Sequence, residues 1–413
     1  MAEATPARRA AAHLLETVLE QHRGLEEGLD SLPAMDARDR AAGHRIAATV
    51  LRRLGSLDAA LEPFLRRAPP APAQRALRIG AAELLLLGTP PHAAVASAVA
   101  LAPRPLAGLV NAVLRRLAAE GPAALEGLDA ERLDTPAWLW AAWHAAHGAR
   151  VRAIAAAHRA EAPLDLTLRP GAPPPPGATL LPTGTARLPP GTRILDLPGF
   201  ADGAFWAQDA AAGLPARLLA PQPGERIADL CAAPGGKTAQ LAAAGAEVFA
   251  VEREAARLPR LRENMARLHL SPTIVHADAA TWAPPAPLDA ILLDAPCTAT
   301  GTIRRHPDVA HLKRPKDVAR HAAEQRRLLA AAARMLRPGG RLVFATCSLQ
   351  PEEGEAHLAS LPEGMQLDPI RPEELPGLGA AITPAGALRT APDLWAEAGG
   401  MDGFFAMRLR RYQ

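Results

Sequence analysis

Two of the three cysteines stand just past apolar runs that have the pattern of β-strands. Cys347 directly follows the run 341–346, and Cys297 comes three residues after the run 290–294. A free cysteine is most often a small buried hydrophobe. Neighbouring parallel strands, however, end at the same edge of a sheet, where ligands bind, so both thiols are expected to face one crevice. Because thiolates are strong nucleophiles, this pairing indicates covalent chemistry.

A glycine-rich turn lies between an apolar run at 226–230 and a helical pattern that begins at Thr238. Its residues are Cys231, Ala232, Ala233, Pro234, Gly235, Gly236 and Lys237. A strand, such a turn and a helix together present backbone N–H groups to a ligand. The phosphate-binding loop needs glycine where Cys231 stands, and the dinucleotide fingerprint needs a third glycine. The remaining interpretation is a turn that binds S-adenosylmethionine (SAM), while another nucleotide or a merely tight turn stays open on these residues alone.

Three acidic residues also fall at expected strand ends. Glu252 follows Asp229 by 23 residues, where a carboxylate accepts hydrogen bonds from ribose hydroxyls. Asp278 follows the third strand and is expected to bond an adenine amino group, and Asp294 ends the fourth strand. The alternatives are a solvated glutamate at 252 and an Asx turn at 278.

The chemistry that fits two thiols beside a methyl donor is methylation of a pyrimidine at carbon 5. That carbon becomes nucleophilic only when a thiolate adds at carbon 6, and a second group must help to release the product. Asp294 is placed to protonate or hydrogen-bond the ring nitrogen. The base must also leave its stack to present its face.

The elements around these residues alternate as strand and helix. Strands are expected at 227–230, 248–252, 273–277, 290–294, 341–346 and 404–409. Helical patterns separate the first five, which predicts an α/β, Rossmann-like domain with a mostly parallel sheet covered on both faces. We assign residues 205–413 to this domain.

Two further parts precede it. One-turn spacing of leucines and valines predicts an all-helical domain over residues 1–122. Residues 123–204 begin with a helical stretch and then read as a small mixed α/β module, with strands at 164–168, 192–197 and 203–206.

Composition limits the expected cellular location of the protein and its possible binding partners. It has 413 residues, a formal net charge of +3 and three widely spaced cysteines, which form no disulfide framework. The N-terminus lacks the apolar stretch of a signal peptide, and no run is long enough to span a membrane. Neither CxxC nor a histidine cluster indicates a metal. We therefore expect a cytoplasmic protein without a membrane or metal partner, whose small positive surplus permits nucleic-acid binding.

At this point the motifs resemble a known family, the bacterial 16S ribosomal RNA cytosine-5 methyltransferases of the RsmB type within the RsmB/NOL/NSUN group. The resemblance covers nearly the whole chain, and its motifs are highly specific in combination. They are the 231–238 turn, Phe205-Trp206-Ala207-Gln208-Asp209, 294–301, Ile303-Arg304-Arg305-His306-Pro307-Asp308, Thr346-Cys347-Ser348, Pro351-Glu352-Glu353 and Gly403-Phe404-Phe405. The helical N-terminus is similar to a NusB-type RNA-binding domain, on Pro90-Pro91-His92-Ala93 and 110–115.

The resemblance implies a role for each matching residue. Cys347 would be the attacking thiolate, and Cys297 would be needed for product release. The SAM site would be lined by Cys231, Ala232, Ala233, Pro234, Gly235, Gly236, Lys237, Glu252, Asp278 and Asp294. The substrate would be small-subunit ribosomal RNA and the protein a monomer. Two positions depart from the family pattern: Thr298 stands where serine is usual, and Gly354 stands where asparagine is common after Pro-Glu-Glu.

Basic residues follow Cys297 and are expected to contact RNA phosphates, which gives affinity without sequence choice. They are Arg304, Arg305, His306, Lys313 and Arg314. The alternative is a solvated start of a helix.

Other functions stay open beside an RNA cytosine-5 methyltransferase. The helical domain would also suit a non-catalytic RNA-binding or ribosome assembly factor, although both thiols and the ligand turn are intact. The enzyme could act on another RNA. In a DNA cytosine methyltransferase the nucleophile would be Cys297, in the Pro-Cys of the fourth strand, and not Cys347.

Overall fold

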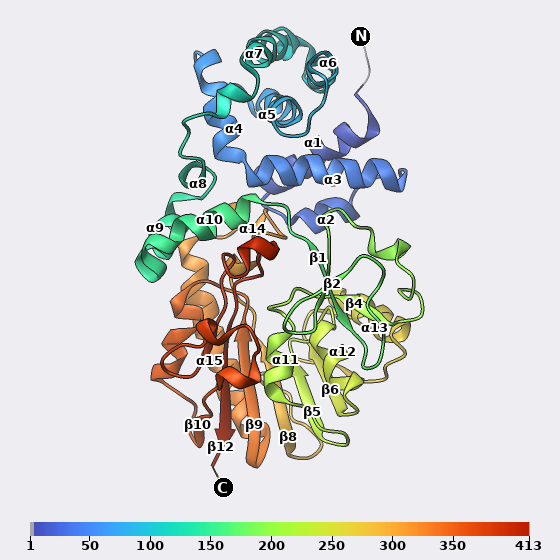
Figure 1. The fold of residues 1–413 in the computed structure, drawn as a ribbon, viewed down its shortest axis with the longest axis vertical. Helices are drawn as coiled ribbons and strands as arrows, with labels where there is room; N and C mark the ends of the chain where they lie inside the picture. Colours follow the sequence, from blue (N-terminus) through green and yellow to red (C-terminus); the bar gives the residue numbers. More distant parts are fainter. Residues whose placement is uncertain (1–3, 413) are drawn as a thin grey trace. The chain divides into compact units, whose positions relative to one another are not determined.

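The computed structural model describes residues 4–412, which form two compact units (Figure 1). The helical unit contains residues 4–160 together with Ile303–Arg314, and the sheet unit contains Glu161–Thr302 and residues 315–412. The chain therefore leaves the sheet unit once, for twelve residues, and returns to it. The sequence had suggested boundaries at 122 and 204, and it had given no sign of the excursion at 303–314.

The helical unit is built from amphipathic helices around one core. Its helices are α1 (Pro6–Leu19), α2 (Leu25–Asp30), α3 (Ala37–Arg52), α4 (Leu54–Leu61), α5 (Ala71–Leu85), α6 (Pro91–Leu101), α7 (Ala107–Glu120), α8 (Ala130–Leu133), α9 (Ala137–His147), α10 (Val151–Arg159) and α14 (Val309–Leu312). Residues at one-turn spacing, such as Leu14, Leu15 and Val18 of α1, are fully buried. Asp36 caps α3, because its carboxylate accepts a hydrogen bond from the backbone N–H of Arg38 at 2.7 Å.

A small antiparallel sheet opens the sheet unit. Its order is β2-β3-β1-β4, with β1 (Leu164–Leu168), β2 (Thr179–Leu180), β3 (Ala186–Leu188) and β4 (Phe205–Ala207). The strand expected at 192–197 is wrong, since these residues contain the 3₁₀ turn Ile194–Asp196. The backbone N–H of Asp196 bonds the carbonyl of Arg193 at 3.1 Å, so the local turn replaces any ladder.

The large sheet carries the elements that position the candidate site. Its order is β10-β12-β9-β8-β5-β6-β7, with β11 paired to β12. The strands are β5 (Arg226–Leu230), β6 (Glu247–Glu252), β7 (Thr273–His276), β8 (Leu288–Asp294), β9 (Leu336–Thr346), β10 (Met365–Leu367), β11 (Leu388–Arg389) and β12 (Phe405–Arg411). All six predicted strands are present, and β5 to β9 are mutually parallel. The strand order reverses between β5 and β8, and this switch point is where α/β sheets bind ligands.

Helices cover both faces of the large sheet. They are α11 (Leu214–Leu219), α12 (Gly236–Ala243), α13 (Leu258–Arg267) and α15 (Pro315–Met335). On one face, Leu328 and Leu329 of α15 pack in a buried cluster with Phe344 of β9. On the other, Leu214 and Leu218 of α11 pack with Val343. Because both faces are buried, the central strands β5, β6 and β8 consist mainly of apolar residues, and acidic residues lie at or near their carboxyl ends.

Candidate active site

The ends of the three central strands lie side by side. In the sheet register Leu230 of β5 is opposite Leu293 of β8, and Asp294 of β8 is opposite Ala345 of β9. The residues that follow these positions therefore share one edge of the sheet. Cys231, Cys297 and Cys347 all follow these strands within three residues.

The turn after β5 has an unusual backbone. Cys231 has a φ of 66°, and its N–H bonds the carbonyl of Val251 in β6 at 2.9 Å. The peptide bond between Ala233 and Pro234 is cis. Gly235 has a φ of 105°, and a Cβ there would lie 2.7 Å from Cδ1 of Leu261. Glycine is required at that position, because a side chain would meet both strain and a packed helix.

Glu252 closes this turn from the neighbouring strand. Its side chain is 3% exposed, and Oε2 accepts a hydrogen bond from the backbone N–H of Ala233 at 3.2 Å. Oε1 accepts a second one from Glu254 N at 2.8 Å. A pocket opens beside these atoms, and its walls include Cys231, Glu252, Asp278, Pro296 and Leu328. Two carboxylates at the ends of β6 and β7 and an apolar wall suit a nucleoside with hydroxyl and amino donors, so these residues fit SAM.

Asp278 makes the Asx turn that the sequence left open as an alternative. Its Oδ1 accepts a hydrogen bond from Ala280 N at 2.9 Å, and Oδ2 pairs with Arg327 at 3.1 Å. The bond from the Ala280 N–H, followed by that from Arg327, lowers the pKa of Asp278. The side chain still lines the pocket, so it stays a charged acceptor there.

Asp229 lies beneath the turn and is almost fully buried. One oxygen accepts a hydrogen bond from Thr238 Oγ1 at 2.5 Å, while Oδ1 is buried without a hydrogen-bond partner. Burial raises the pKa of Asp229 to about 7, despite the opposing bond from Thr238. This carboxyl group therefore titrates near neutral pH.

Lys237 connects the turn to the fourth strand. Its Nζ donates to Asp294 Oδ2 at 2.7 Å and lies 5.2 Å from the centre of the Phe404 ring. Burial opposes the charged form of Lys237, but the carboxylate of Asp294 outweighs it and the pKa of Lys237 is raised. The charge of Cys347 acts in the same direction. A cation is thus held between Asp294 and the Cys347 segment.

The side chains of Cys297 and Cys347 lie next to each other, as expected from the sequence. The Sγ atoms of Cys297 and Cys347 are 3.4 Å apart, and both side chains are partly accessible. The hydrogen bond with Cys347 and burial together raise the pKa of Cys297. The third cysteine, Cys231, has its pKa raised by burial, since it packs at the base of the turn. The two sulfur atoms thus converge at the edge of the sheet that also carries the ion pair of Lys237 and Asp294.

Glu353 is a residue of this site that the sequence reasoning did not single out as functional. It is fully buried and accepts hydrogen bonds from Thr298 and Ser348, the residues that follow the two cysteines. Gln325 of α15 joins the same network, with Nε2 bonded to Pro296 O at 2.9 Å. The motif Pro351-Glu352-Glu353 was the available signal, but it gave no indication of which glutamate turns inward.

The basic segment after Cys297 does not lie as expected. Ile303–Arg314 packs within the helical unit, where Asp308 Oδ2 accepts a hydrogen bond from Leu25 N at 2.9 Å. Arg304 is 1% exposed, so its expected phosphate contact is not available. Burial lowers the pKa of His306 to about 4, which leaves it uncharged at neutral pH. Arg305 and Lys313 are half-buried and Arg314 is exposed.

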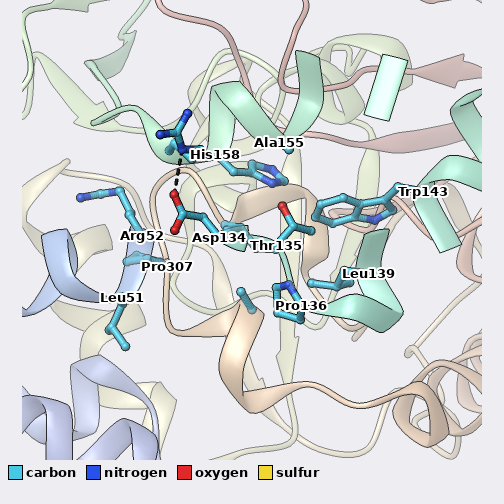
Figure 2. A pocket seen from close by; sticks show the side chains of 13 residues that line it. Leu51, Arg52, Asp134, Thr135, Pro136, Leu139, Trp143, Ala155, His158 and Pro307 are labelled. Atoms are coloured by element: carbon cyan, nitrogen blue, oxygen red, sulfur yellow. Dashed lines mark hydrogen bonds and ion pairs between the residues drawn. The ribbon is translucent and has the colours of Figure 1, made fainter. Parts of the chain in front are cut away.

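A small pocket in the helical unit shows how this segment is held (Figure 2). Ile303, Pro307 and Ala310 face Leu139 and Trp143 of α9 across it. Beside the pocket, Asp134 accepts hydrogen bonds from Arg159 Nε at 2.8 Å and from Ser56 N at 2.7 Å, which join α10 to α4. The lining is a packing seam within the helical unit.

Residues 4–412 contain neither a metal-binding cluster nor a helix that could span a membrane. No group of three or more His, Cys, Asp or Glu side chains in this range is arranged to hold a metal ion. Within the same range, no helix combines the length and the apolar character needed to cross a bilayer.

Comparisons with known proteins agree with this geometry. Residues 216–410 match the family model described as 16S rRNA methyltransferase RsmB/F, and residues 5–119 match the NusB family. The chain is 37% identical to ribosomal RNA small subunit methyltransferase B of Pseudomonas putida, over 97% of this chain and 98% of the relative. It is 39% identical to the protein of the same name from Xanthomonas campestris, over 85% of this chain and 86% of the relative.

Solved structures give the same fold. The crystal structure of PH0851 aligns with a TM-score of 0.73 at 20% identity, covering 99% of this chain and 100% of that one. A methyltransferase homologue from Pyrococcus horikoshii aligns with a TM-score of 0.53 at 27% identity, over 66% of this chain and 93% of that one. Taken with the relatives matched along almost their full length, this places the chain in the RsmB/F family of 16S rRNA methyltransferases, SAM-dependent enzymes that methylate RNA.

Proposed function

We propose that this chain methylates carbon 5 of a cytosine in small-subunit ribosomal RNA through a covalent adduct between the base and Cys347. The observation that carries the proposal is the 3.4 Å separation of the Cys297 and Cys347 sulfur atoms at the edge of the sheet. The names of the relatives support small-subunit rRNA as the substrate. The chemistry of two convergent thiols supports carbon 5 of a pyrimidine as the target.

In this mechanism each residue has a separate task. The Cys347 thiolate forms a bond to carbon 6 of the flipped cytosine, while Asp294, acting in its acid form, gives a proton to the ring nitrogen where negative charge develops and takes it back when the base is released. When bound, SAM supplies the methyl group that carbon 5 takes up. The proton on carbon 5 then passes to water, and the electron pair of that C–H bond forms the double bond between carbon 5 and carbon 6. The carbon–sulfur bond breaks at the same time and its electron pair leaves with Cys347 as thiolate, with Cys297 needed for this release.

The surrounding charges support separate roles for Cys297 and Cys347. Lys237, which pairs with Asp294, places a positive charge near the Cys347 segment. The carboxylate of Glu353 acts on Cys297 and, after the Cys347 hydrogen bond and burial, contributes to its raised pKa. A thiol whose pKa is raised suits a group that handles protons, which supports Cys297 in product release and leaves the nucleophilic role to Cys347.

We further propose that RNA phosphates contact Lys313 and Arg314, at the end of the basic segment. The accessibility of both side chains supports them over Arg304, which is buried. Such contacts would strengthen binding at low salt without selecting a sequence.

The test compares wild type, Cys347→Ala and Cys297→Ala with labelled SAM and small-subunit rRNA that lacks the modification. We expect no methyl transfer from Cys347→Ala, and from Cys297→Ala a protein–RNA adduct that survives denaturation. An adduct with Cys347→Ala and none with Cys297→Ala would reverse the nucleophile assignment. Absence of methyl transfer by wild type to any RNA would favour a non-catalytic assembly factor instead.

A further inference from the structure

One buried carboxyl group is bonded to both cysteine segments. Glu353 is 0% exposed and ends the 3₁₀ turn Pro351–Glu353. Its Oε1 accepts a hydrogen bond from the backbone N–H of Thr298 at 2.9 Å. Its Oε2 accepts hydrogen bonds from Ser348 Oγ at 2.5 Å and from Thr298 Oγ1. Thr298 follows Cys297 and Ser348 follows Cys347, so the carboxyl group joins the residue after each thiol.

A second set of contacts fixes the carboxyl group itself. The main-chain carbonyl of Glu353 accepts a hydrogen bond from Thr346 Oγ1 at 2.9 Å. Gln325, also fully buried, donates from Nε2 to Pro296 O at 2.9 Å and, more weakly, to Glu353 Oε1 at 3.4 Å. The Gln325 oxygen is bonded to His357 Nε2 at 2.9 Å. A buried polar network of this kind orients its members closely when all are bonded.

The network is polar where core packing alone would favour apolar residues. Burial raises the pKa of Glu353, and the hydrogen bonds from Ser348, Thr298 and Gln325 oppose this cost. Burying an acid is unfavourable unless it is well bonded, so a residue that served only to fill space would be apolar. The contacts of Glu353 converge on the two segments that carry the sulfur atoms.

We propose that Glu353 is a positioning residue that holds the sulfur atoms of Cys297 and Cys347 together at the reacting base. It does not touch the substrate, and it acts through Thr298 and Ser348. The inference rests on the proposed function in one respect, that both cysteines act on the same cytosine. The convergence of the two thiols is measurable without RNA, so the two proposals fail separately.

The measurement is the equilibrium between the Cys297–Cys347 dithiol and its disulfide in a glutathione buffer. Formation of the bond between the two sulfur atoms oxidises both thiols, and oxidised glutathione takes up the two electrons and two protons to give two reduced glutathione molecules. The ratio reports how close the two thiols are held. Peptide mass spectrometry identifies the pair, because the chain has only one other cysteine, Cys231.

Four variants probe the network and one serves as control. Glu353→Ala removes it, and Glu353→Gln keeps the size and the acceptor for Thr298 N but not the charge. Thr298→Val and Ser348→Ala each remove one hydroxyl donor and leave Glu353 itself unchanged. The matched control is Glu352→Gln, since Glu352 is the exposed neighbour.

We expect the disulfide equilibrium constant to fall at least tenfold in Glu353→Ala and by a smaller factor in Glu353→Gln, Thr298→Val and Ser348→Ala. In the same variants kcat for methyl transfer should fall by a similar factor, whereas the Kd for SAM stays within about twofold of wild type. Glu352→Gln should match wild type in all three measurements.

The proposal is overturned if the disulfide equilibrium in Glu353→Gln, Thr298→Val and Ser348→Ala equals that of wild type, even where their thermal stability falls. That result would make Glu353 a stabilising residue only. If Glu353→Ala does not fold, these three variants decide the matter. A wild-type protein that transfers no methyl group but shows the predicted disulfide shifts would refute the proposed function and leave the positioning role standing.

Discussion

The buried carboxyl group of Asp229 should make the stability of the sheet unit depend on pH. Burial raises its pKa from an ordinary value of 3.8 to about 7. The folded protein therefore keeps a proton on Asp229 that the unfolded chain releases near pH 4. Its contribution to stability is complete below pH 4 and is lost as the pH rises towards 7.

The size of the effect follows from the shift. About three pKa units at roughly 1.4 kcal/mol each give a loss of about 4 kcal/mol between pH 4 and pH 8. Asp229→Asn carries no titrating group, so this part of the slope should disappear. At low pH, where wild-type Asp229 is protonated, the asparagine is expected to lower stability by about 1–3 kcal/mol, because its amide N–H₂ would replace the buried Oδ1, which has no hydrogen-bond partner. At pH 8, where wild type has lost its own contribution, the variant should be at least as stable as wild type.

The assay is urea unfolding at pH values from 5 to 8, followed by pulsed hydrogen exchange and mass spectrometry of peptides from β5 and α12. These peptides report on the sheet unit separately from the helical one. Asp289→Asn is the matched control, because the pKa of Asp289 is lowered and its effect falls below this pH range. If Asp229→Asn kept the wild-type dependence of unfolding free energy on pH, the assignment of a neutral buried Asp229 would be refuted.

Three further predictions concern single contacts. Glu252→Gln should weaken SAM binding at least tenfold, about 1.4 kcal/mol, in calorimetric titration, because a carboxylate at the end of β6 is lost; an unchanged Kd would contradict its role. Gly301→Ala should abolish methyl transfer and lower Tm, since the new Cβ would lie 1.9 Å from Gly403 O. The control is Gly108→Ala, which lies in helix α7 with open space around it; this variant should keep wild-type methyl transfer and have an equal or higher Tm. Asp308→Ala should speed hydrogen exchange at the start of α2 by removing the acceptor of Leu25 N, a loss of about 1 kcal/mol; equal exchange in wild type and variant would show that the bond is not significant.

Local patterns in the sequence were sufficient to predict the strands of the large sheet. Helices separate the five parallel strands as expected, except between β7 and β8, where the helix expected from the sequence is wrong because residues 277–287 form turns. The central strands are mainly apolar, as expected for a sheet covered on both faces. The polar residues at those ends were therefore visible in the sequence as candidates. The same reasoning failed at 192–197, where apolar alternation occurs in a turn that is closed by local hydrogen bonds.

The excursion at 303–314 shows the limit of such patterns. Arginines at 304 and 305 read as a basic surface, because sequence shows charge but not burial. Only the folded chain brings Asp308 to Leu25 across 283 residues and covers Arg304. Contacts between residues so distant in the chain produce no periodic pattern in the sequence.

The sequence by itself determined which groups stand at the strand ends, because strand period and turn chemistry are local. It also determined the family, through the spelling of the motifs. Tertiary structure alone decided that the two sulfur atoms lie 3.4 Å apart and that Glu353, and not Glu352, turns inward between their segments. Distances of that kind depend on the strand register and on buried hydrogen bonds formed across the sheet, and neither is encoded in the spacing of residues along the chain.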